Sequence, residues 1–515
     1  MELLSPAGNV EKLRYCYAYG ADAAYIGLKN FSLRVKADNF YADEYEQVAA
    51  IKAAYPGRKL HCALNISFHN KEIDRLKAEI PYFRLYPIDA FIVQDLGIVP
   101  LLQKEFPHAA LHLSTQASCM NREAVKVYRS LGFTRIVMGR EASLAEIAEI
   151  KDAVPDMEIE CFVHGAMCIA YAGRCLMSAY LNGRSAQEGF CSHTCRWDYD
   201  LLVNKGWLDK AGSKFLAESG ALVLKEKKRP EESFPVYEGE HFTAVLSSKD
   251  LCMIDCLDDF KKAGVDSLKI EGRMKSVYYV ALITRAYRKA LDALEGRTSQ
   301  EDAAPFIDEL YKVSHRPYGR GFYFDAAEAD VTVSGESSSP YELSAQVGAE
   351  LAPAPAEQVF ARAASLKKRR QEEYESLVPQ AKKAYEDRVK NLPDRYLPPV
   401  EAKAGWRFYA LKVQNMITQE SVLEAVGPDF VSLPLPAGSW QLVNPETGTV
   451  YRWCCDGHPA VLYTAVELGE NVLLRSPVLP ETSAGTASGA DPAAAGPAGS
   501  AAISGDSLPE TSATS

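Results

Sequence analysis

The residues best suited to chemistry are cysteines gathered in residues 160–197, a stretch that holds five of the chain's twelve. No pair among them has the CxxC spacing: six residues separate Cys168 from Cys175, and three separate Cys191 from Cys195. Structural zinc sites typically use short CxxC knuckles, because two ligands from one turn preorganise half a tetrahedron. Iron–sulfur clusters accept thiolates from scattered loops. The spacing therefore favours a cluster over zinc.

Two other features bear on these thiols. A cysteine nucleophile needs an activated thiolate beside a histidine, and His164 lies four residues before Cys168. Further along the chain, Cys252 and Cys256 lie in "SSKDLCMIDCLDDFKKAG", which we interpret as a turn and a helix. Cys252 is expected to fold back toward the first group. On spacing alone, a cluster, a zinc site and a nucleophile all stay open.

Composition limits where and how these cysteines act. The chain has 515 residues, 47% of them hydrophobic and 24% charged, which is typical of a globular protein with two or three domains. Neither a long apolar run nor a signal peptide is apparent, so we expect a cytoplasmic protein without a membrane span, whose thiols stay reduced. The net charge of -11 argues against a strongly basic surface but allows a local basic channel.

The elements that must position the cysteines alternate in type over the first 290 residues. Amphipathic segments separate eight short apolar runs: "ELLSPAG", "AAYIGLK", "LHCALNI", "AFIVQDLG", "ALHLSTQAS", "RIVMGRE", "MEIECFVHG" and "SLKIEGR". Eight such repeats predict an α/β protein with a (β/α)8 TIM-like barrel. A doubly wound open sheet is the alternative, but its GxGxxG signature is missing.

Active sites of such barrels lie at the carboxyl ends of the strands, where many of these runs end in polar residues. We expect a substrate pocket there, formed by Asn65, Gln94, Gln116, Arg140, Glu141 and Lys269. Arginine grips carboxylates bidentately, so Arg140 and Arg273, with Lys269, are predicted to bind a small carboxylate. The alternative is that such residues cap helices or pair with one another, as Arg273 could with Glu271 or Glu141.

The chain divides into several predicted regions. They are a barrel over residues 1–295 with a Cys-rich insertion at 164–250 after the seventh strand, an extension at 296–355, a charged helix at 356–395 despite Pro379, a small β-rich domain at 400–477 within a C-terminal α+β region, and a disordered tail at 478–515. An insertion after a strand's carboxyl end lies over the mouth of the barrel. The cysteines are therefore expected beside the predicted pocket.

Three stretches carry a resemblance to a known family. The string "ECFVHGAMCIAYAGRCLMS" resembles the signature of the peptidase U32 family, the collagenase-like proteases. The opening "ELLSPAGNVEKLRYCYAYGADAAYIGLKNFSLRVKADNF" and the pair "SSKDLCMIDCLDDFKKAGVDSLKIEGRMKSVYYVALITRAYRKALD" and "VSHRPYGRGFYF" are also similar to it. The resemblance covers residues 1 to about 325. The region after it does not match the β-barrel domain in which many relatives end.

The resemblance implies an oxygen-independent hydroxylase with a [4Fe-4S] cluster, which forms 5-hydroxyuridine at the wobble position of transfer RNA with prephenate as hydroxyl donor. Related alternatives are hydroxylation of 23S ribosomal RNA or of a quinone precursor, or a peptidase. It places the cluster ligands on Cys168, Cys175, Cys191 and Cys252, with Cys195 as the contender for one place. We further assign catalytic roles to Glu160, His164, Glu271 and Arg273, and expect an electron donor as partner.

Overall fold

The computed structural model describes residues 1–28, 31–33, 38–40, 43–168, 170–182, 184–187, 190–193, 195, 223–226, 229–235, 237–238, 243–244, 248–324, 337–391 and 398–478. Residues Met1–Val478 form one compact unit. The predicted disordered tail, apart from Val478, and much of the Cys-rich insertion lie outside the described residues.

Eight parallel strands close into a barrel, as the alternation of apolar runs predicted. They are β1 (Glu2–Pro6), β2 (Ala23–Ile26), β3 (Lys59–Leu64), β4 (Ala90–Val93), β5 (Ala110–Leu113), β6 (Arg135–Val137), β7 (Glu158–Ala166) and β13 (Ser267–Ile270). Neighbours in sequence pair with one another, and β13 closes the ring by pairing with both β7 and β1. The (β/α)8 fold is therefore confirmed.

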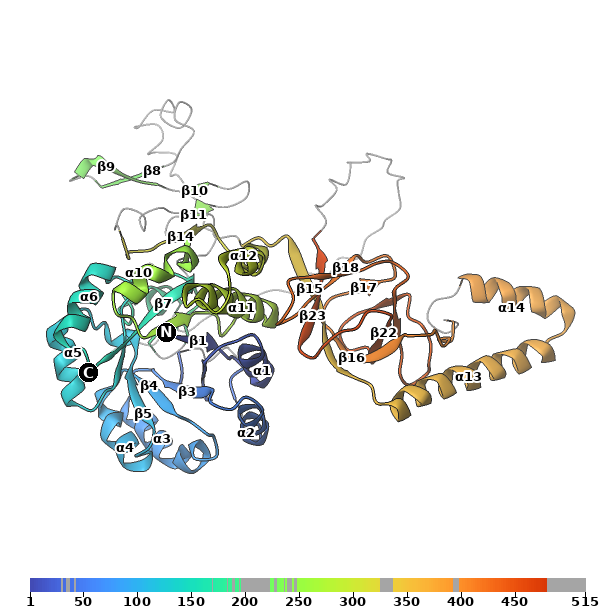
Figure 1. Ribbon diagram of the computed structural model, residues 1–515, viewed down its shortest axis with the longest axis horizontal. Coiled ribbons are helices and arrows are strands. Elements are labelled where there is room, and N and C mark those ends of the chain that lie inside the picture. Colours follow the sequence, from blue (N-terminus) through green and yellow to red (C-terminus); the bar gives the residue numbers. More distant parts are fainter. Residues whose placement is uncertain are drawn as a thin grey trace, which may run out of the picture. The chain divides into compact units, whose positions relative to one another are not determined.

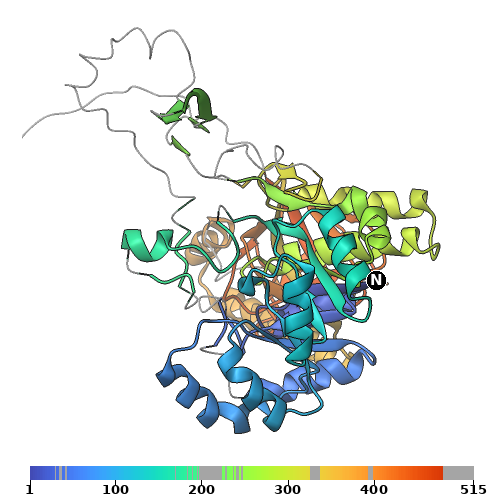
Figure 2. The ribbon, with the colours of Figure 1, turned by 90° about the vertical axis from the view of Figure 1, so that its left-hand side faces the viewer.

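Helices cover the outside of these strands (Figures 1 and 2). They are α1 (Val10–Ala18), α2 (Tyr45–Ala54), α3 (Asn70–Phe83), α4 (Val99–Glu105), α5 (Arg122–Ser130), α6 (Leu144–Ala153), α10 (Leu257–Lys262), α11 (Val277–Leu294) and α12 (Gln300–Asp308). The short 3-10 helices of this region are η1 (Leu96–Ile98), η2 (Thr115–Ala117), η4 (Ile254–Cys256) and η5 (Glu309–Lys312). Side-chain caps fix several starts; Asn9 accepts from the Lys12 amide, and Ser143 forms a capping box with Glu146. Among the described helices, none has both the length and the apolar character to span a bilayer.

The seventh strand extends beyond the barrel and receives the end of the insertion. The insertion contains α7 (Met177–Asn182), β8 (Val223–Glu226), β9 (Arg229–Pro235), β10 (Tyr237–Glu238), β11 (Thr243–Ala244) and β12 (Asp250–Cys252). Strand β12 runs antiparallel to the end of β7, with Cys252 opposite His164, and β14 (Tyr318–Gly319) extends this edge. The expectation that Cys252 lies on a helix is wrong, because pairing with β7 keeps its backbone extended.

A second, antiparallel sheet follows the barrel. Its strands, in sheet order, are β19 (Leu433–Leu435), β18 (Leu423–Val426), β23 (Val472–Pro477), β15 (Tyr341–Glu350), β16 (Arg407–Val413), β22 (Ala460–Thr464) and β20 (Trp440–Val443), and β17 (Ile417–Thr418) pairs with β21 (Trp453–Cys454) nearby. We expected this β-rich region to begin at residue 400. Instead β15, which precedes the charged helix in sequence, lies in the middle of the sheet between β23 and β16.

The predicted charged helix is two helices. Helix α13 (Pro353–Ser376) ends before Leu377, whose backbone is extended, and α14 (Pro379–Asn391) begins at Pro379. Proline disfavours a helical residue before it and suits the first turn of a new helix, which explains the break. The first half of α13 packs on the second sheet through buried Val359 and Ala363.

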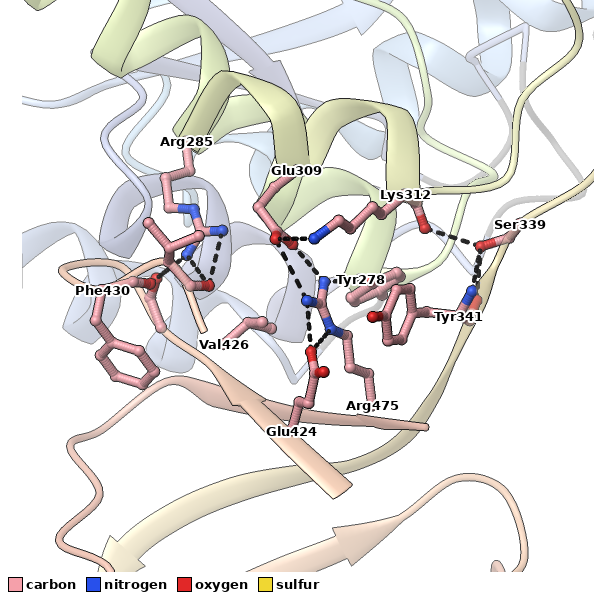
Figure 3. Close-up of polar contacts among 12 residues, drawn as sticks. Tyr278, Arg285, Glu309, Lys312, Ser339, Tyr341, Glu424, Val426, Phe430 and Arg475 are labelled. Carbon is pink, nitrogen blue, oxygen red and sulfur yellow. Dashed lines mark hydrogen bonds and ion pairs between the residues drawn. The ribbon is translucent and has the colours of Figure 1, made fainter. Parts of the chain in front are cut away.

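The barrel and the second sheet are joined by buried polar contacts, drawn in Figure 3. The fully buried Arg475 on β23 pairs with Glu309 of η5 and, at 2.7 Å, with Glu424 of β18. Its guanidinium also donates to the Tyr278 hydroxyl at 3.1 Å. From the barrel side, Arg285 donates to the carbonyl oxygens of Phe430, at 2.6 Å, and Gly427. We call these contacts the Arg475 clasp.

Candidate functional site

The carboxyl ends of the barrel strands open on a cavity of about 360 Å³. Small-molecule sites usually measure about 300–1,000 Å³, so this cavity suits a small ligand. Seven of the residues predicted for the pocket or for catalysis line it: Asn65, Gln116, Arg140, Glu141, Lys269, Glu271 and Arg273. The polar mouth expected from the strand ends is therefore present.

Three predicted residues do not line this cavity. Gln94 lies beside it and supports its wall, because its side-chain amide donates to the Asn65 carbonyl at 2.8 Å. Glu160 lies deeper in the barrel, and His164 lies against helix α11. The catalytic roles assigned to Glu160 and His164 stay predictions.

Glu160 anchors the floor beneath the cavity. Its carboxylate is fully buried and pairs with Lys269 Nζ at 2.7 Å and with Arg135 Nη1 at 3.0 Å. Burial alone would raise the pKa of Glu160, but Lys269 and Arg135 hold it below its usual value. Lys269 therefore lines the cavity in a position that Glu160 fixes.

The backbone explains why His164 faces away from the cavity. The pairing of β7 with β13 shifts register between Lys269 and Ile270, so that Lys269 pairs with Phe162 and Ile270 with His164. Such a bulge breaks the alternation of side chains. The imidazole lies 3.4 Å from the hydroxyls of both Tyr287 and Tyr318, and burial lowers its pKa to about 3.

Among the described residues of the cavity wall, cations outnumber carboxylates: Arg140, Lys269, Arg273 and Lys275 against Glu141 and Glu271. Two aromatic rings support these cations. The Arg140 guanidinium lies 3.8 Å from the centre of the Phe162 ring, and Lys269 Nζ lies 4.7 Å from that of Tyr25. We did not predict either ring, although their places near strand ends in "AAYIGLK" and "MEIECFVHG" were a usable signal. The wall suits an anion such as a carboxylate.

Four cysteines line the same cavity: Cys168, Cys175, Cys191 and Cys195. The turn between the first two is held against the barrel at Gly173, which has a φ of +77°. A Cβ at Gly173 would lie 2.1 Å from the Gln116 carbonyl oxygen, so this approach requires glycine. The neighbouring Ala172 amide donates to Glu141 at 3.2 Å. The loops after β5 and β6 thus position the first cysteine pair.

The third cysteine is positioned by a serine pair. The hydroxyls of Ser178, at the start of α7, and Ser192 lie 2.7 Å apart, and the Ser192 amide donates to Ser178 Oγ at 3.1 Å. Because Ser192 follows Cys191 directly, these bonds fix the backbone at that thiol. We did not predict this positioning role of Ser178.

Cys252 has a different environment. It is half-buried, does not line the cavity, and its Sγ lies 3.9 Å from the Tyr287 hydroxyl. Burial raises the pKa of the Cys252 thiol to about 11. It pairs across the strands with His164, four residues before Cys168. The structure thus groups Cys195, rather than Cys252, with the three other cysteines of the cavity.

A separate trio lies in the barrel interior. Within the described part of the chain, His61, His112 and Glu160 are the group whose potential ligand atoms lie within 4.8 Å of one another. Glu160 is already bound by Lys269 and Arg135. These two fixed positive charges would repel a metal cation, so the trio is a poor metal site.

Comparisons with known proteins agree with this architecture. The sequence profile described as peptidase family U32 matches residues 8–332. The chain is 39% identical to tRNA hydroxylation protein P of Escherichia coli, covering 62% of this chain and 74% of that protein, and 38% identical to its namesake of Haemophilus influenzae, covering 62% and 73%. It is 34% identical to the 23S rRNA 5-hydroxycytidine C2501 synthase of Escherichia coli, covering 68% and 48%.

Proposed function

Because the chain belongs to peptidase family U32, and relatives in the comparison are named for hydroxylation of tRNA and rRNA, we propose that it hydroxylates RNA. The observation that carries this proposal is one cavity lined by both cysteines and cations. Transfer RNA is the favoured substrate, with the wobble uridine as target and 5-hydroxyuridine as product. Ribosomal RNA and a quinone precursor are the alternatives.

We propose that the cavity cysteines hold a [4Fe-4S] cluster. The donor set fits, because four soft thiolate ligands reach one cavity from separate loops, as a cubane requires. Cys168, Cys175 and Cys191 supply three ligands. The fourth is Cys195, which lines the cavity, or Cys252, whose strand adjoins the end of β7. When bound, the cluster would supply one-electron chemistry to the site, in exchange with an electron donor.

We propose that the cationic wall binds the hydroxyl donor, a carboxylate such as prephenate. Arg140, Lys269 and Arg273 are the binding groups, and the rings of Tyr25 and Phe162 keep two of these cations in place. Gln116 and Asn65 add hydrogen-bonding groups to the same wall. A cysteine peptidase would need a histidine beside a cavity thiol. His164 contacts Tyr287 and Tyr318 instead, but His193 lines the cavity together with the cysteines, so a peptidase stays the alternative function.

Iron and sulfide analysis of protein purified without oxygen tests the cluster. We expect about four of each per chain, and loss of both in Cys168→Ser, Cys175→Ser and Cys191→Ser. Cys455→Ser, in the second sheet's domain, is the matched control and should keep the iron. Comparing Cys195→Ser with Cys252→Ser identifies the fourth ligand. Zinc, or iron unaffected by Cys168→Ser, would overturn the cluster.

Nucleoside analysis tests the reaction. Transfer RNA from a strain that lacks this protein should have no 5-hydroxyuridine, and the wild-type protein should restore it while Cys168→Ser does not. Ribosomal RNA and quinones from the same strains test the two alternatives. Unchanged RNA and quinones, together with proteolysis that Cys168→Ser abolishes, would replace the hydroxylase with a peptidase.

A further inference from the structure

Helix α13 lies outside residues 8–332, which the family profile matches. A groove runs along each of two sides of this helix. The first groove is lined from α13 by Arg362, Arg369 and Arg370, and from the sheet by loop residues such as Asn444 and Thr447. The second is lined from α13 by Lys367, Arg370 and Tyr374, and from the other side by Lys403 and Gln419. We call them the α13 grooves.

Helical spacing places these cations in two stripes. Arg362, Leu366 and Arg369 follow one another at intervals of four and three residues and line the first groove. Lys367, Arg370 and Tyr374 have intervals of three and four and line the second. Residues three and four apart share one face of a helix, so each stripe faces one groove. Arg370 lies between the two faces and lines both grooves.

The charges of α13 are segregated. The helix carries glutamates at positions 357, 372, 373 and 375, and none of them lines either groove. Of its five cations, all except Lys368 line a groove. Lys368 instead lies 3.8 Å from Glu372, its ion-pair partner. The grooves are therefore basic on a chain whose net charge is -11.

The opposite walls oppose this charge weakly. Among the described residues, Glu446 is the one carboxylate residue that lines the first groove, and Glu401 is the one that lines the second. Glu401 already pairs with Lys367 at 3.1 Å, and both side chains are exposed. Arg369 is exposed, and no carboxylate among the described residues lies within ion-pairing distance of it. Solvent-exposed cations along a groove suit the repeated charges of a phosphate backbone.

Aromatic side chains accompany the basic ones in the second groove. Tyr374 and Tyr385 line it with their rings 5.7 Å apart, and Lys403 Nζ lies 3.8 Å from the centre of the Trp406 ring. Proteins that bind RNA combine cations for the backbone with aromatic rings for unstacked bases. An acidic peptide would need the cations but not the rings, so the groove chemistry favours RNA.

We propose that the α13 grooves bind the phosphate backbone of the RNA substrate. This inference rests on the proposed function, because it assigns RNA capture to the second domain and chemistry to the barrel cavity. The contacts are to phosphates and carry no base sequence, so they hold the RNA while the cavity selects the reacting base.

Transfer RNA binding by the full chain tests this proposal, with tRNA taken from a strain lacking the protein. The variant Arg369→Glu/Arg370→Glu should weaken binding at least tenfold, because two phosphate contacts become repulsive. Lys368→Glu changes the charge of the same helix outside the grooves and should bind nearly as wild type. Circular dichroism and iron content should be the same in all three proteins.

The results of the tRNA-binding experiment distinguish a failure of the α13 grooves as the RNA site from a failure of the proposed hydroxylase function. If the double variant binds tRNA as tightly as wild type, or if Lys368→Glu is equally impaired, the α13 grooves are not the RNA site, although the hydroxylase can stand. If the wild type binds no tRNA but does bind a poly-glutamate peptide through Arg369 and Arg370, the grooves are a protein site. Loss of iron in the cysteine variants is unaffected by either result.

Discussion

The barrel cavity and the α13 grooves are both lined by cations, but they hold those cations differently. In the cavity, Lys269 is buried and fixed by Glu160, and Arg140 lies on the Phe162 ring. Along the grooves, the side chains of Arg369 and Lys367 are exposed to solvent. A buried cation with fixed partners selects one small anion, whereas exposed cations suit a long, multiply charged one.

The comparison predicts different responses to mutation and to salt. Charges in the cavity are shielded from ions in solution. Removing one of them can leave an oppositely charged buried side chain without its partner, which destabilises the fold. Charges along the grooves act nearly independently and are screened by salt. The following changes separate the two regions, beginning with the largest expected effect.

Lys269→Met should lower the free energy of unfolding by about 3–5 kcal/mol, because it leaves the buried Glu160 carboxylate with one cation in place of two. Urea denaturation measures this loss. Lys275→Met is the matched control in the same cavity, where the ammonium donates to the Ser314 carbonyl at 3.4 Å. Equal losses in both variants would contradict the coupling between Lys269 and Glu160.

Arg273→Ala should lower kcat/KM for prephenate by about 100-fold, because a buried guanidinium that grips a carboxylate is worth roughly 2–3 kcal/mol. Its affinity for tRNA should stay the same. Arg369→Ala should show the opposite pattern, with weaker tRNA binding and an unchanged KM for prephenate. Steady-state kinetics with each substrate varied in turn would check both predictions. If Arg273→Ala and Arg369→Ala have identical effects, the cavity and the grooves do not bind different ligands.

Salt should weaken tRNA binding while leaving the KM for prephenate nearly constant. The slope of log Kd against log salt should fall by about two in Arg369→Glu/Arg370→Glu, one for each lost phosphate contact. Titrations between 50 and 200 mM salt, roughly the range over which such contacts respond, measure it. A slope unchanged from wild type would place the phosphate contacts elsewhere.

Mild acid should destabilise the barrel slightly. Burial lowers the pKa of His61 to about 4, from an ordinary value near 6.5, so the unfolded chain takes up the proton first as pH falls. The neutral His61 ring therefore contributes fully to the free energy of unfolding above pH 6.5, and this contribution is lost as the pH falls from about 6.5 to 4. Between pH 7 and pH 5.5 the loss amounts to roughly 1 kcal/mol.

Urea midpoints at the two pH values provide the measurement for this effect. His61→Gln should depend less on pH than wild type, because it removes the titrating ring. His108→Gln, at an exposed site, should keep the wild-type dependence. If His61→Gln and wild type lose the same free energy of unfolding on acidification, groups other than His61 cause the pH dependence.

The barrel could be predicted because each strand is a local apolar run and each helix has its own cap, such as Asn9 or Ser143. The site was predictable as a set of strand-end residues, since all parallel strands end at one face. Its details depend on contacts between distant residues. The ion pairs of Glu160 with Arg135, from the neighbouring strand, and with Lys269 are of this kind, and its catalytic role stays a prediction.

The orientation of the His164 side chain could not be predicted from the sequence either. Regular alternation places His164 on the same side as Phe162, but the register shift beside Ile270 turns it toward α11. The place of β15 in the second sheet depends on pairing with β23, more than a hundred residues later. The break before Pro379, by contrast, could have been predicted, because proline disfavours a helical residue before it. Our prediction of one continuous helix there was wrong.

The Arg475 clasp bears on how this chain can be divided. Residues 8–332 match the family profile, and a fragment ending near residue 332 is the obvious piece to isolate. That fragment would keep Glu309 and Arg285 but lose Arg475 and the carbonyl groups that satisfy them. Cutting the chain there would therefore remove these partners of both side chains. Swapping in a relative's C-terminal region would require transplanting both halves of the clasp together.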